Sequence, residues 1–497
     1  MAPGSALSEL AVAVAGQLHG VTTSDPEIVD VTHDSRQAGP GVLFVAIQGE
    51  HNDGHRFVPD AVAGGAAAVC VEREMGTSVP ELVVDDTRAV LGPLASMAHG
   101  KPSETLKVIG VTGTDGKTTV THYVESISSG AGLSTGLVGT IRTRYAGKSV
   151  ESERTTPEAS DFQRLLAEMR DAGVTVAAVE VSSHALALRR VAGTRFDVAV
   201  FTNLSQDHLD FHGDMASYLA VKRSLFEEYQ VGTAVVNSDD PAGVEIARSR
   251  RGDLVTVGGD GDVRVEERSP LESGTAFTLV TPWGSGRVTT PVMGAFNVDN
   301  AAIAAASCLS AGIDFDSVLA GLEDLSPVPG RFEIVSQGGP VTVIVDYAHT
   351  PRGISEAIDA ARAMTRGRVI ALGGAGGDRD REKRPMMGRA LSEADLAVVT
   401  SDNPRSEEPE AIIAEVSSGL APGTDAMVIV DRGRAIVAAV TAAREGDLIL
   451  VLGRGHEPMQ ETGGDRRPFD DRQVVKKALA GTRRSANSDA KSGSMGQ

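Results

Sequence analysis

Two series of valine-rich runs alternate with helical stretches, and they constrain the fold of this chain more than any other feature. The first series begins near residue 106, with "LKVIGVT", "VTVAAVE", "FDVAVFTN" and "GTAVVN". The second follows "PVPGR" at residues 327–331, with "VTVIVDYA", "RVIALGG", "LAVVTSDN", "AMVIVD" and "DLILVLGRG". Continuous apolar runs separated by helices are typical of strands in a parallel sheet that is buried on both faces. The sequence therefore predicts two doubly wound α/β domains.

The length of the chain implies a third domain. At 497 residues the chain is too long for one ordinary core, and about three domains are expected. Short strand-like runs around the helical segment "VPDAVAGGA" predict a small N-terminal α/β domain over residues 1–100. We predict a central P-loop-type parallel-sheet domain over 101–330, a C-terminal Rossmann-like doubly wound domain over 331–480, and a disordered polar tail over 481–497.

Composition excludes several classes of partner. The chain has 47 basic and 67 acidic residues, and its net charge of −20 repels polyanions, so we expect no nucleic-acid partner. Its two cysteines, Cys70 and Cys308, lie in alanine-rich stretches typical of a core, which argues against a disulfide framework or a metal cluster. No basic segment precedes an apolar run at the N-terminus, and no apolar run approaches ~20 residues. We therefore expect a soluble cytoplasmic protein without membrane insertion. We also expect a monomer.

A glycine-rich loop follows the first run of the central series. In "VIGVTGTDGKTTVTHYV" (108–124), the Walker spacing G-x-x-x-x-G-K-[ST] places Val111 where its first glycine belongs. The context is nevertheless a strand, a loop and a helix, in which backbone N–H groups and a helix N-terminus face a bound anion. Lys117 would then reach the β- and γ-phosphates of a nucleotide, and Thr118 would bind Mg²⁺ through its hydroxyl. The alternative is a tight strand-to-helix turn made by the loop glycines.

Polar side chains also end the next two runs of the central series. Glu180 ends "VTVAAVE", and His208 follows "FDVAVFTN" in "NLSQDHLDFHG". Because ligands bind outside the carboxyl ends of parallel strands, both residues are expected on the sheet edge that carries the glycine loop. A carboxylate and an imidazole there suit a hard metal ion. Taken singly, each residue fits a structural capping role equally well.

A lysine interrupts the apolar face of the helix that follows. In "GDMASYLAVKRSLFEEY", Lys222 lies on the same face as Tyr218, Leu219, Leu225 and Phe226. Burial disfavours a charged ammonium and lowers its pKa, so the simplest interpretation is an amine that snorkels to solvent. The alternative is a neutral amine that reacts with CO₂, which would make Lys222 an anionic oxygen ligand for Mg²⁺. The pattern alone favours snorkelling.

A series of short motifs resembles, in content and in order, those of the Mur ligases, the ATP-dependent ligases that build the peptidoglycan stem peptide. The resemblance spans residues from about 31 to 475 and is closest to the members that add the third residue. The loop of this family reads T-G-T-N-G-K-T, and Asp115 stands where Asn is usual, so we expect its carboxylate to point away from the phosphates or toward a metal. The motifs are "GVTGTDGKTT", "TTPEASDFQ", "EVSSHAL", "NLSQDHLDFHGDM", "YLAVKRSLF", "GAFNVDNAAIA", "PGRFE", "DYAHTP", "GGDRDREKRP", "SDNPR" and "GRGHE".

The resemblance implies an ATP and Mg²⁺ site. Its catalytic residues would be Lys117, Glu180, His208 and a carbamylated Lys222 that bridges to a second Mg²⁺, which raises the carbamate above snorkelling. The metal ligands would be Thr118, Glu180, His208 and the Lys222 carbamate. The ATP contacts would be Gly113, Thr114, Asp115, Gly116, Lys117, Thr118, Thr119, Asn297, Arg331 and Asp346.

The resemblance also implies two substrate sites. One departure from the pattern is Leu188, where some members carry a substrate-contacting Gln. UDP-sugar contacts would be His33, Ser35, His51, Asn52, Thr155, Thr156, Ser182 and Arg190. Diaminopimelate contacts would be Arg379, Asp402, Asn403, Pro404, Arg405, Gly453 and Glu457.

Arg405 carries the choice of amino acid in this interpretation. Its guanidinium is a planar fork of donors suited to a carboxylate, and diaminopimelate differs from lysine by a carboxylate at its far end. Lysine would leave this cation unpaired. The alternative for Arg405 is a surface salt bridge with Glu407 or Glu408.

The implied activity is ligation of diaminopimelate, the meso isomer ahead of the LL isomer, to the D-Glu γ-carboxylate of UDP-MurNAc-L-Ala-D-Glu through an acyl phosphate, in peptidoglycan precursor synthesis. The partners would be these small molecules and ATP. A folylpolyglutamate synthetase-like ligase would share the loop, the lysine helix and the chemistry, but would not need "HDSR" or "DNPR". A nucleotide-dependent switch would hydrolyse ATP without an acceptor and would leave Lys222 unexplained.

Overall fold

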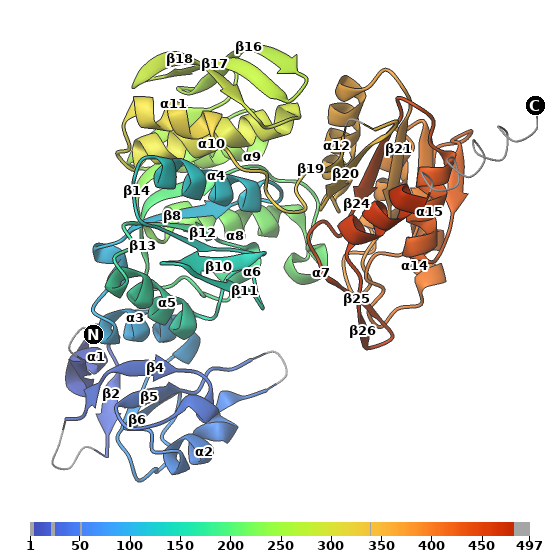
Figure 1. The fold of residues 1–497 in the computed structure, drawn as a ribbon. Coiled ribbons are helices and arrows are strands. Elements are labelled where there is room, and N and C mark those ends of the chain that lie inside the picture. The colour runs from blue at the N-terminus through green and yellow to red at the C-terminus, as the bar shows by residue number, and fades with distance from the viewer. Residues whose placement is uncertain (1–3, 21–24, 50–51, 338, 482–497) are drawn as a thin grey trace, which may run out of the picture.

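Three α/β bodies follow one another along the chain in the computed structural model, which describes residues 4–20, 25–49, 52–337 and 339–481 (Figure 1). The predicted α/β fold class is therefore confirmed. Residues 482–497 of the predicted tail and the predicted sugar contact His51 lie outside the described residues. Both cysteines are buried and free of disulfides, as predicted. None of the helices described is long and apolar enough to cross a membrane.

The first body is built on a five-stranded sheet in the order β2-β7-β6-β5-β4, in which only β2 pairs antiparallel. Its buried leucines, valines and alanines pack against helices on both faces. The strands are β2 (Gln17–His19), β4 (Asp30–Thr32), β5 (Val42–Val45), β6 (Ala68–Val71) and β7 (Glu81–Val83), with β1 (Ser5–Ala6) and β3 (Glu27–Ile28) paired beside them. The helices are α1 (Leu7–Ala13), α2 (Val58–Ala63) and α3 (Thr87–Ala98), with 3₁₀ turns η1 (Ser35–Gln37), η2 (Gly54–Phe57) and η3 (Pro102–Glu104).

The second body contains an eight-stranded sheet in the order β11-β10-β9-β12-β8-β13-β14-β15. Neighbours from β9 to β15 are parallel, while β10 and β11 form an antiparallel edge hairpin. The central strands bury Val, Ile and Ala on both faces, which is why their sequences lack polar alternation. The strands are β8 (Lys107–Thr112), β9 (Thr135–Val138), β10 (Arg142–Tyr145), β11 (Lys148–Glu151), β12 (Val176–Glu180), β13 (Arg195–Phe201), β14 (Gln230–Asn237) and β15 (Asp253–Val257).

Helices cover both faces of this sheet, and a small antiparallel sheet caps one of them. Phe277 and Val288 of the small sheet pack into the same core as the alanine-rich helix α10. The small sheet comprises β16 (Arg264–Leu271), β17 (Gly274–Thr281) and β18 (Gly284–Thr290). The helices are α4 (Lys117–Gly130), α5 (Ala159–Asp171), α6 (Ser183–Ala187), α7 (Leu209–His212), α8 (Met215–Glu227), α9 (Pro241–Ser249), α10 (Ala295–Ser310) and α11 (Phe315–Glu323).

The third body has a six-stranded sheet in the order β19-β20-β24-β21-β22-β23, with β19 antiparallel and the others parallel. Its strands are β19 (Glu333–Ser336), β20 (Thr342–Asp346), β21 (Val369–Gly373), β22 (Leu396–Val399), β23 (Ala426–Val428) and β24 (Leu448–Leu452), followed by the hairpin β25 (Met459–Thr462) and β26 (Asp465–Pro468). Its helices are α12 (Pro351–Met364), α13 (Lys383–Leu391), α14 (Pro409–Ser417) and α15 (Arg432–Ala442).

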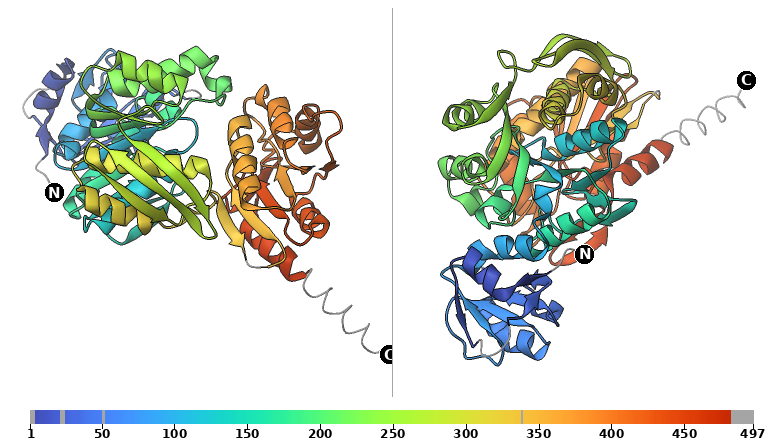
Figure 2. Two further views of the ribbon diagram at one scale, coloured as in Figure 1. Left: turned by 90° about the horizontal axis from the view of Figure 1, so that it is seen from above. Right: turned by 90° about the vertical axis from the view of Figure 1, so that its left-hand side faces the viewer.

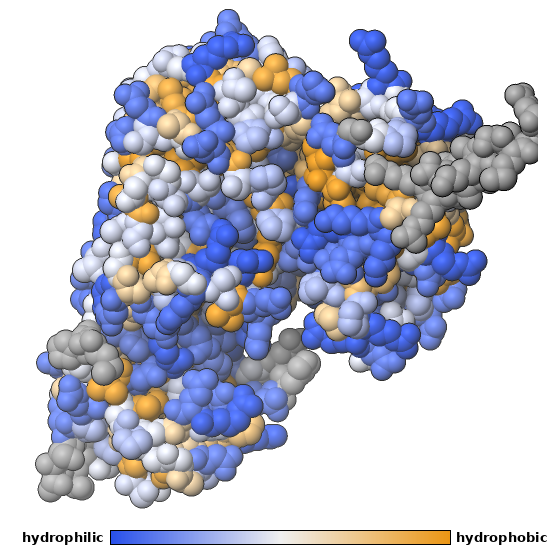
Figure 3. All heavy atoms as spheres, viewed as in Figure 1, coloured by the Kyte–Doolittle hydropathy of each residue, from blue (hydrophilic) through white to orange (hydrophobic). Residues whose placement is uncertain are grey.

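The third body stands to one side of the second, and the first packs at the far end of the second (Figures 1 and 2). The second and third bodies are joined at 327–331, where Gly330 has a φ of 66° and packs against Gly455 and His456. A hollow lies between these two bodies, and Figure 3 shows hydrophilic side chains on both of its walls. The carboxyl ends of β8, β12 and β13 from one body, and of β20, β21, β22 and β24 from the other, carry most of the residues that line this hollow.

Candidate active site

The glycine loop makes a sharp connection between β8 and α4. Gly113 has a φ of 150°, and a Cβ there would lie 1.8 Å from the hydroxyl oxygen of Thr202. Gly116, with a φ of 85°, would place a Cβ 2.6 Å from the side-chain oxygen of Asn300. Side chains at either position would therefore clash as well as strain the backbone. The loop brings the N-terminus of α4, with its free N–H groups, to the hollow.

Lys117 lies folded over this loop. Its Nζ donates to the carbonyl oxygens of Gly113 at 2.9 Å and Thr114 at 2.8 Å. Burial lowers the pKa of the Lys117 amine, although the charges of Glu180 and Asp115 oppose the shift. The amine therefore sits at the mouth of the loop, where an anion of high charge would favour its protonated form.

Glu180 is fully buried behind the loop and accepts three hydrogen bonds. Its Oε2 accepts from the hydroxyls of Thr118 at 2.9 Å and Thr140 at 3.0 Å, and its Oε1 accepts from Thr140 N at 2.8 Å. Arg331, from the hinge segment, donates to the Thr118 hydroxyl at 3.0 Å and stacks 4.2 Å from the ring centroid of Tyr347. Thr118 thus touches residues of both bodies. Sequence reasoning missed Thr140, because it follows β9, whose short run gave no strand signal.

His208 lines the same hollow and is held in a left-handed backbone conformation, with a φ of 55°. Burial lowers its pKa to about 3, so its imidazole is neutral and has a lone pair to offer. Within the described residues, no three His, Cys, Asp or Glu side chains are grouped so as to hold a metal by themselves. The oxygens of Thr118 and Glu180 and the neutral His208 are a suitable partial set for Mg²⁺, and phosphate oxygens of a nucleotide would have to complete it.

Lys222 does not snorkel, because its side chain is fully buried. Its Nζ donates to the Gly113 carbonyl at 2.8 Å and lies 4.4 Å from the ring centroid of Tyr218. Burial, together with the nearby charge of Lys117, lowers the pKa of the Lys222 amine well below its usual value. The Lys222 amine therefore contacts the phosphate loop mostly in its neutral form, and a neutral amine is a better nucleophile than an ammonium.

The unusual Asp115 points across the interface between the two bodies. Its Oδ2 accepts from the hydroxyls of Ser205 and Thr350, each at 3.2 Å. Thr350 is the N-cap of α12 in the third body. The carboxylate is thus occupied by two hydroxyl donors, which explains how an acidic residue is accommodated in an anion-binding loop.

A cavity of about 540 Å³ joins most of the predicted site into one cleft. One wall carries the glycine loop, Glu180 and His208, together with Thr155, Ser182 and Arg190 of the predicted sugar site. The opposite wall belongs to the third body and carries residues predicted to contact the amino acid: Arg379, Asp402, Asn403, Arg405, Gly453 and Glu457. A phosphoryl donor and an amine could therefore meet in this cleft.

The cleft wall formed by the third body, called the amino-acid wall below, combines the Arg405 guanidinium with the acidic side chains Asp402 and Glu457. Arg405 donates to the Gly377 carbonyl at 2.6 Å, while Glu407 accepts from Arg384 at 2.7 Å. Among the described residues, Arg405 forms no ion pair with Glu407 or Glu408, so the alternative of a surface salt bridge is wrong. Glu457 accepts from Asn403 at 2.6 Å, and burial followed by the charge of Asp402 raises its pKa. Asp402 Oδ2 is buried without a hydrogen-bond partner. An unpaired buried oxygen of this kind suits an ammonium ligand.

A smaller cavity of about 100 Å³ adjoins the loop and is lined by the predicted nucleotide contacts Asn297, Arg331 and Asp346. Asp346 accepts from the backbone N–H groups of Phe332 at 2.5 Å and Ala348 at 2.7 Å, and burial raises its pKa. Asn297 donates to the Met293 carbonyl at 3.0 Å. These side chains shape the pocket wall from both sides of the hinge.

The remaining predicted sugar contacts are not brought into the main cleft. His33 lines a separate cavity of about 500 Å³ between the first and second bodies and lies 2.9 Å from the Ser160 hydroxyl. Ser35 opens η1, and Asn52 is exposed. Thr156 is buried and donates to the Glu180 carbonyl at 2.8 Å. Pro404, which was predicted to contact diaminopimelate, is buried beside the cleft. Leu188 accepts a hydrogen bond from Arg88 at its carbonyl, at 3.4 Å, and its backbone N–H donates to the His184 carbonyl at 2.9 Å.

Models of protein-family domains match this chain in three stretches. Residues 27–99 match "Mur ligase family, catalytic domain", 111–308 match "Mur ligase middle domain", and 330–455 match "Mur ligase, glutamate ligase domain". The UDP-N-acetylmuramoyl-L-alanyl-D-glutamate--2,6-diaminopimelate ligase of Gloeobacter violaceus is 46% identical over 465 residues, which are 92% of this chain and 94% of that protein. A solved structure of a ligase with the same name is 30% identical, with a TM-score of 0.69 over 97% of this chain and 99% of its own. Folylpolyglutamate synthase of Mycobacterium tuberculosis shares the fold, with a TM-score of 0.61 and 22% identity over 74% of this chain and 92% of its own.

Proposed function

This chain belongs to the Mur ligase family, and we propose that it joins diaminopimelate to the D-Glu γ-carboxylate of UDP-MurNAc-L-Ala-D-Glu. It is an ATP-dependent amide ligase. The observation that carries the proposal is the single cleft in which the glycine loop and Glu180 face Arg405 and Glu457. A relative that carries the diaminopimelate ligase name, at 46% identity over nearly the whole chain, supports the same substrates.

Bound ATP would lie across the loop, with its base in the smaller cavity beside Asn297. Lys117 would exchange its two carbonyl partners for phosphate oxygens, and Arg331 would approach from the hinge. Thr118, Glu180 and His208 would hold Mg²⁺, which when bound offsets negative charge as the phosphoryl group transfers. We place the nucleotide and metal here because these residues converge at one sheet edge.

Once converted to a carbamate, Lys222 would add a second anionic group to the site, beside Glu180. Its neutral amine can attack CO₂, forming an N–C bond and losing a proton to solvent, to give a carbamate. Full burial and the low pKa of the amine favour this reaction over retention of an ammonium. A carbamate beside the Gly113 carbonyl would break the present hydrogen bond and direct its oxygens to a second Mg²⁺.

The proposed reaction proceeds in two steps. A D-Glu γ-carboxylate oxygen takes the γ-phosphoryl group of ATP, which releases ADP and leaves an acyl phosphate. The amine of diaminopimelate then attacks the acyl carbon, phosphate departs, and the nitrogen loses a proton. The cationic side chains in the cleft favour the approach of two anions that would otherwise repel each other.

Arg405 and the acidic pair would read the far end of the amino acid. Arg405 would bind the distal carboxylate, and Asp402 with Glu457 would bind the distal ammonium. Asp402 and Arg405 share the loop after β22, whereas Glu457 follows β24, so the distal carbon would be contacted from two loops. Such an arrangement can discriminate the configuration of that carbon, and we propose the meso isomer. A folylpolyglutamate synthetase-like activity has support only from the shared fold.

Phosphate release with different amines tests this function. With ATP, Mg²⁺ and UDP-MurNAc-L-Ala-D-Glu, we expect turnover with meso-diaminopimelate, weaker turnover with the LL isomer, and a kcat/KM for L-lysine lower by roughly 1,000-fold or more, because lysine leaves Arg405 unpaired. A pteroyl acceptor with glutamate is the control for the alternative ligase. Equal rates with lysine and diaminopimelate, or turnover only with the pteroyl acceptor, would refute the assignment.

A further inference from the structure

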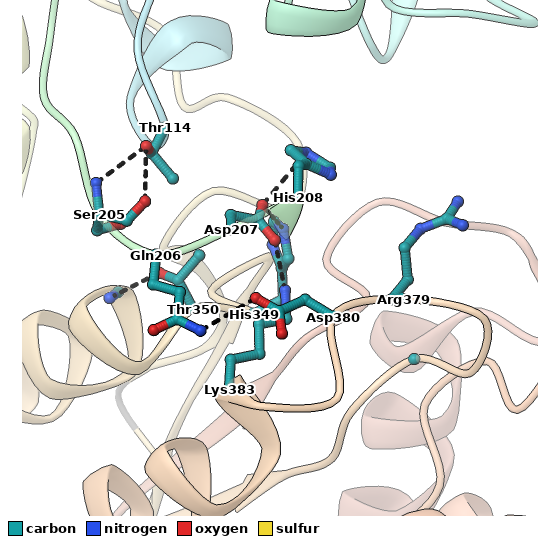
Figure 4. A network of polar contacts seen from close by, with 12 residues as sticks. Thr114, Ser205, Gln206, Asp207, His208, His349, Thr350, Arg379, Asp380 and Lys383 are labelled. Atoms are coloured by element: carbon teal, nitrogen blue, oxygen red, sulfur yellow. Dashed lines mark hydrogen bonds and ion pairs between the residues drawn. The ribbon is translucent and has the colours of Figure 1, made fainter. Parts of the chain in front are cut away.

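The segment 205–208, between β13 and α7, touches both the phosphate loop and the third body (Figure 4). On one side, Ser205 N donates to the Thr114 hydroxyl at 3.0 Å, and that hydroxyl lies 3.2 Å from the Ser205 carbonyl. On the other side, Gln206 donates to Asp380 at 3.2 Å. The segment also carries His208. It is therefore the structural link between the phosphate loop, a proposed metal ligand and the amino-acid wall.

The strongest contact across this boundary is an ion pair between Asp207 and Lys383. Lys383 Nζ lies 2.6 Å from Asp207 Oδ1, and the two side chains are only 5% and 6% exposed. The rings of His349 and His208 each lie 3.3 Å from Asp207 Oδ2. The Asp207 carboxylate therefore faces the ammonium and one imidazole of the third body and one imidazole of its own body. The carboxylate is thus charged, buried and shared between two bodies.

The location of Lys383 within α13 does not by itself stabilise a positive charge. It is the first residue of α13, where the helix dipole disfavours positive charge. The helix begins beside Asp380, whose Oδ1 accepts from Glu382 N at 2.9 Å and whose Oδ2 accepts from Gln206. The loop 379–383 is therefore tied to the 205–208 segment at both Asp380 and Lys383. Figure 4 shows the Arg379 side chain directed away from these ties.

We propose that Lys383 is a positioning residue, whose ion pair with Asp207 docks the loop 379–383 against the segment that carries His208. The proposal rests on the function proposed above. Docking places Arg379 on the cleft wall opposite the phosphate loop, and the amino-acid pocket is complete only while this contact is made. Opening of the third body separates the pair, so recognition of the amine is coupled to closure over the nucleotide.

Because the ion pair is buried only in the closed enzyme, loss of Lys383 should destabilise the closed state and not the open state. In an open enzyme, Asp207 and Lys383 are both hydrated, and removing either leaves the other in water. In the closed enzyme, removing Lys383 leaves a buried carboxylate without its ammonium, which is strongly unfavourable. A neutral residue at 383 therefore penalises the closed state and leaves the open state and the fold intact.

The test compares Lys383→Met, Lys383→Arg and the control Lys476→Met, an exposed lysine of the same body. For Lys383→Met we expect the kcat/KM for diaminopimelate to fall roughly 100-fold, because the unpaired Asp207 disfavours closure. The Kd of an ATP analogue should stay within about twofold, and Tm within about 2 °C. Lys383→Arg keeps the charge and should recover to within about tenfold of wild type.

Two further measurements separate positioning from direct contact with substrate. Small-angle X-ray scattering should show compaction of the wild type, but not of Lys383→Met, with ATP analogue and UDP-MurNAc-dipeptide. Adding Asp207→Asn to Lys383→Met should restore part of the lost kcat/KM, because the unpaired buried charge that disfavours closure is gone. Normal compaction of Lys383→Met, or a matching rise in the Kd for the ATP analogue, would overturn the proposal. A wild type that compacts but ligates no diaminopimelate would instead refute the proposed function.

Discussion

Lys222→Ala is expected to reduce ligation by roughly 100- to 1,000-fold, the effect typical of removing one preorganised electrostatic group. The amine lies 2.8 Å from the Gly113 carbonyl, so any anion built on it would act at the phosphates. Lys222→Arg should fail as well, because a guanidinium cannot be deprotonated to take up CO₂. Initial rates of phosphate release measure both variants.

The control and the rescue distinguish a carbamate from a packing role. Arg223→Ala, at the neighbouring and half-exposed position, should retain ligation. A short-chain carboxylic acid added to Lys222→Ala should restore part of the activity by entering the vacated space as an oxygen ligand. Wild-type rates in Lys222→Arg would contradict the carbamate, and the metal site would then have to be built on Glu180 and His208 alone.

Arg405→Ala is expected to lower the kcat/KM for diaminopimelate by roughly 1,000-fold, because the distal carboxylate loses a two-pronged, charge-assisted partner. The preference over L-lysine should largely disappear in the same variant. The Kd of an ATP analogue should not change, since Arg405 lies on the wall opposite the glycine loop. Steady-state kinetics with both amines and calorimetry with the analogue check these values.

Arg434→Ala is the matched control, since Arg434 is an exposed arginine of the same body, outside the cleft. It should retain both the rate and the preference. A parallel loss of nucleotide affinity in Arg405→Ala would show that the amino-acid wall has been assigned to the wrong residues.

The sequence predicted the sheets well where burial is two-sided. β8, β12, β13 and β14 are adjacent in one sheet, and β20 to β24 form the other, because only parallel strands between helices tolerate such continuous apolar runs. The sheets at exposed edges were missed. β11 is exposed along its whole length and β16 along most of it, so neither shows an apolar pattern.

Single residues of the candidate site could be predicted from the sequence, but the contacts between distant residues could not. The apolar face predicted for α8 made Lys222 stand out, and in the structure the Lys222 side chain is fully buried against the phosphate loop. No pattern announces a contact such as Asp207–Lys383, which joins residues 176 positions apart on different bodies. Nor could the sequence show that His33 lies in a separate cavity from the glycine loop.

The most direct test of the account follows oxygen through the reaction. UDP-MurNAc-L-Ala-D-Glu labelled with ¹⁸O in its γ-carboxylate is incubated with the enzyme, ATP, Mg²⁺ and meso-diaminopimelate, and the products are weighed by mass spectrometry. The account predicts a nucleotide product heavier by one diaminopimelate residue and one ¹⁸O in each released phosphate, because the carboxylate oxygen leaves with the phosphoryl group. Phosphate without the label, or ATP hydrolysis without a heavier product, would contradict it.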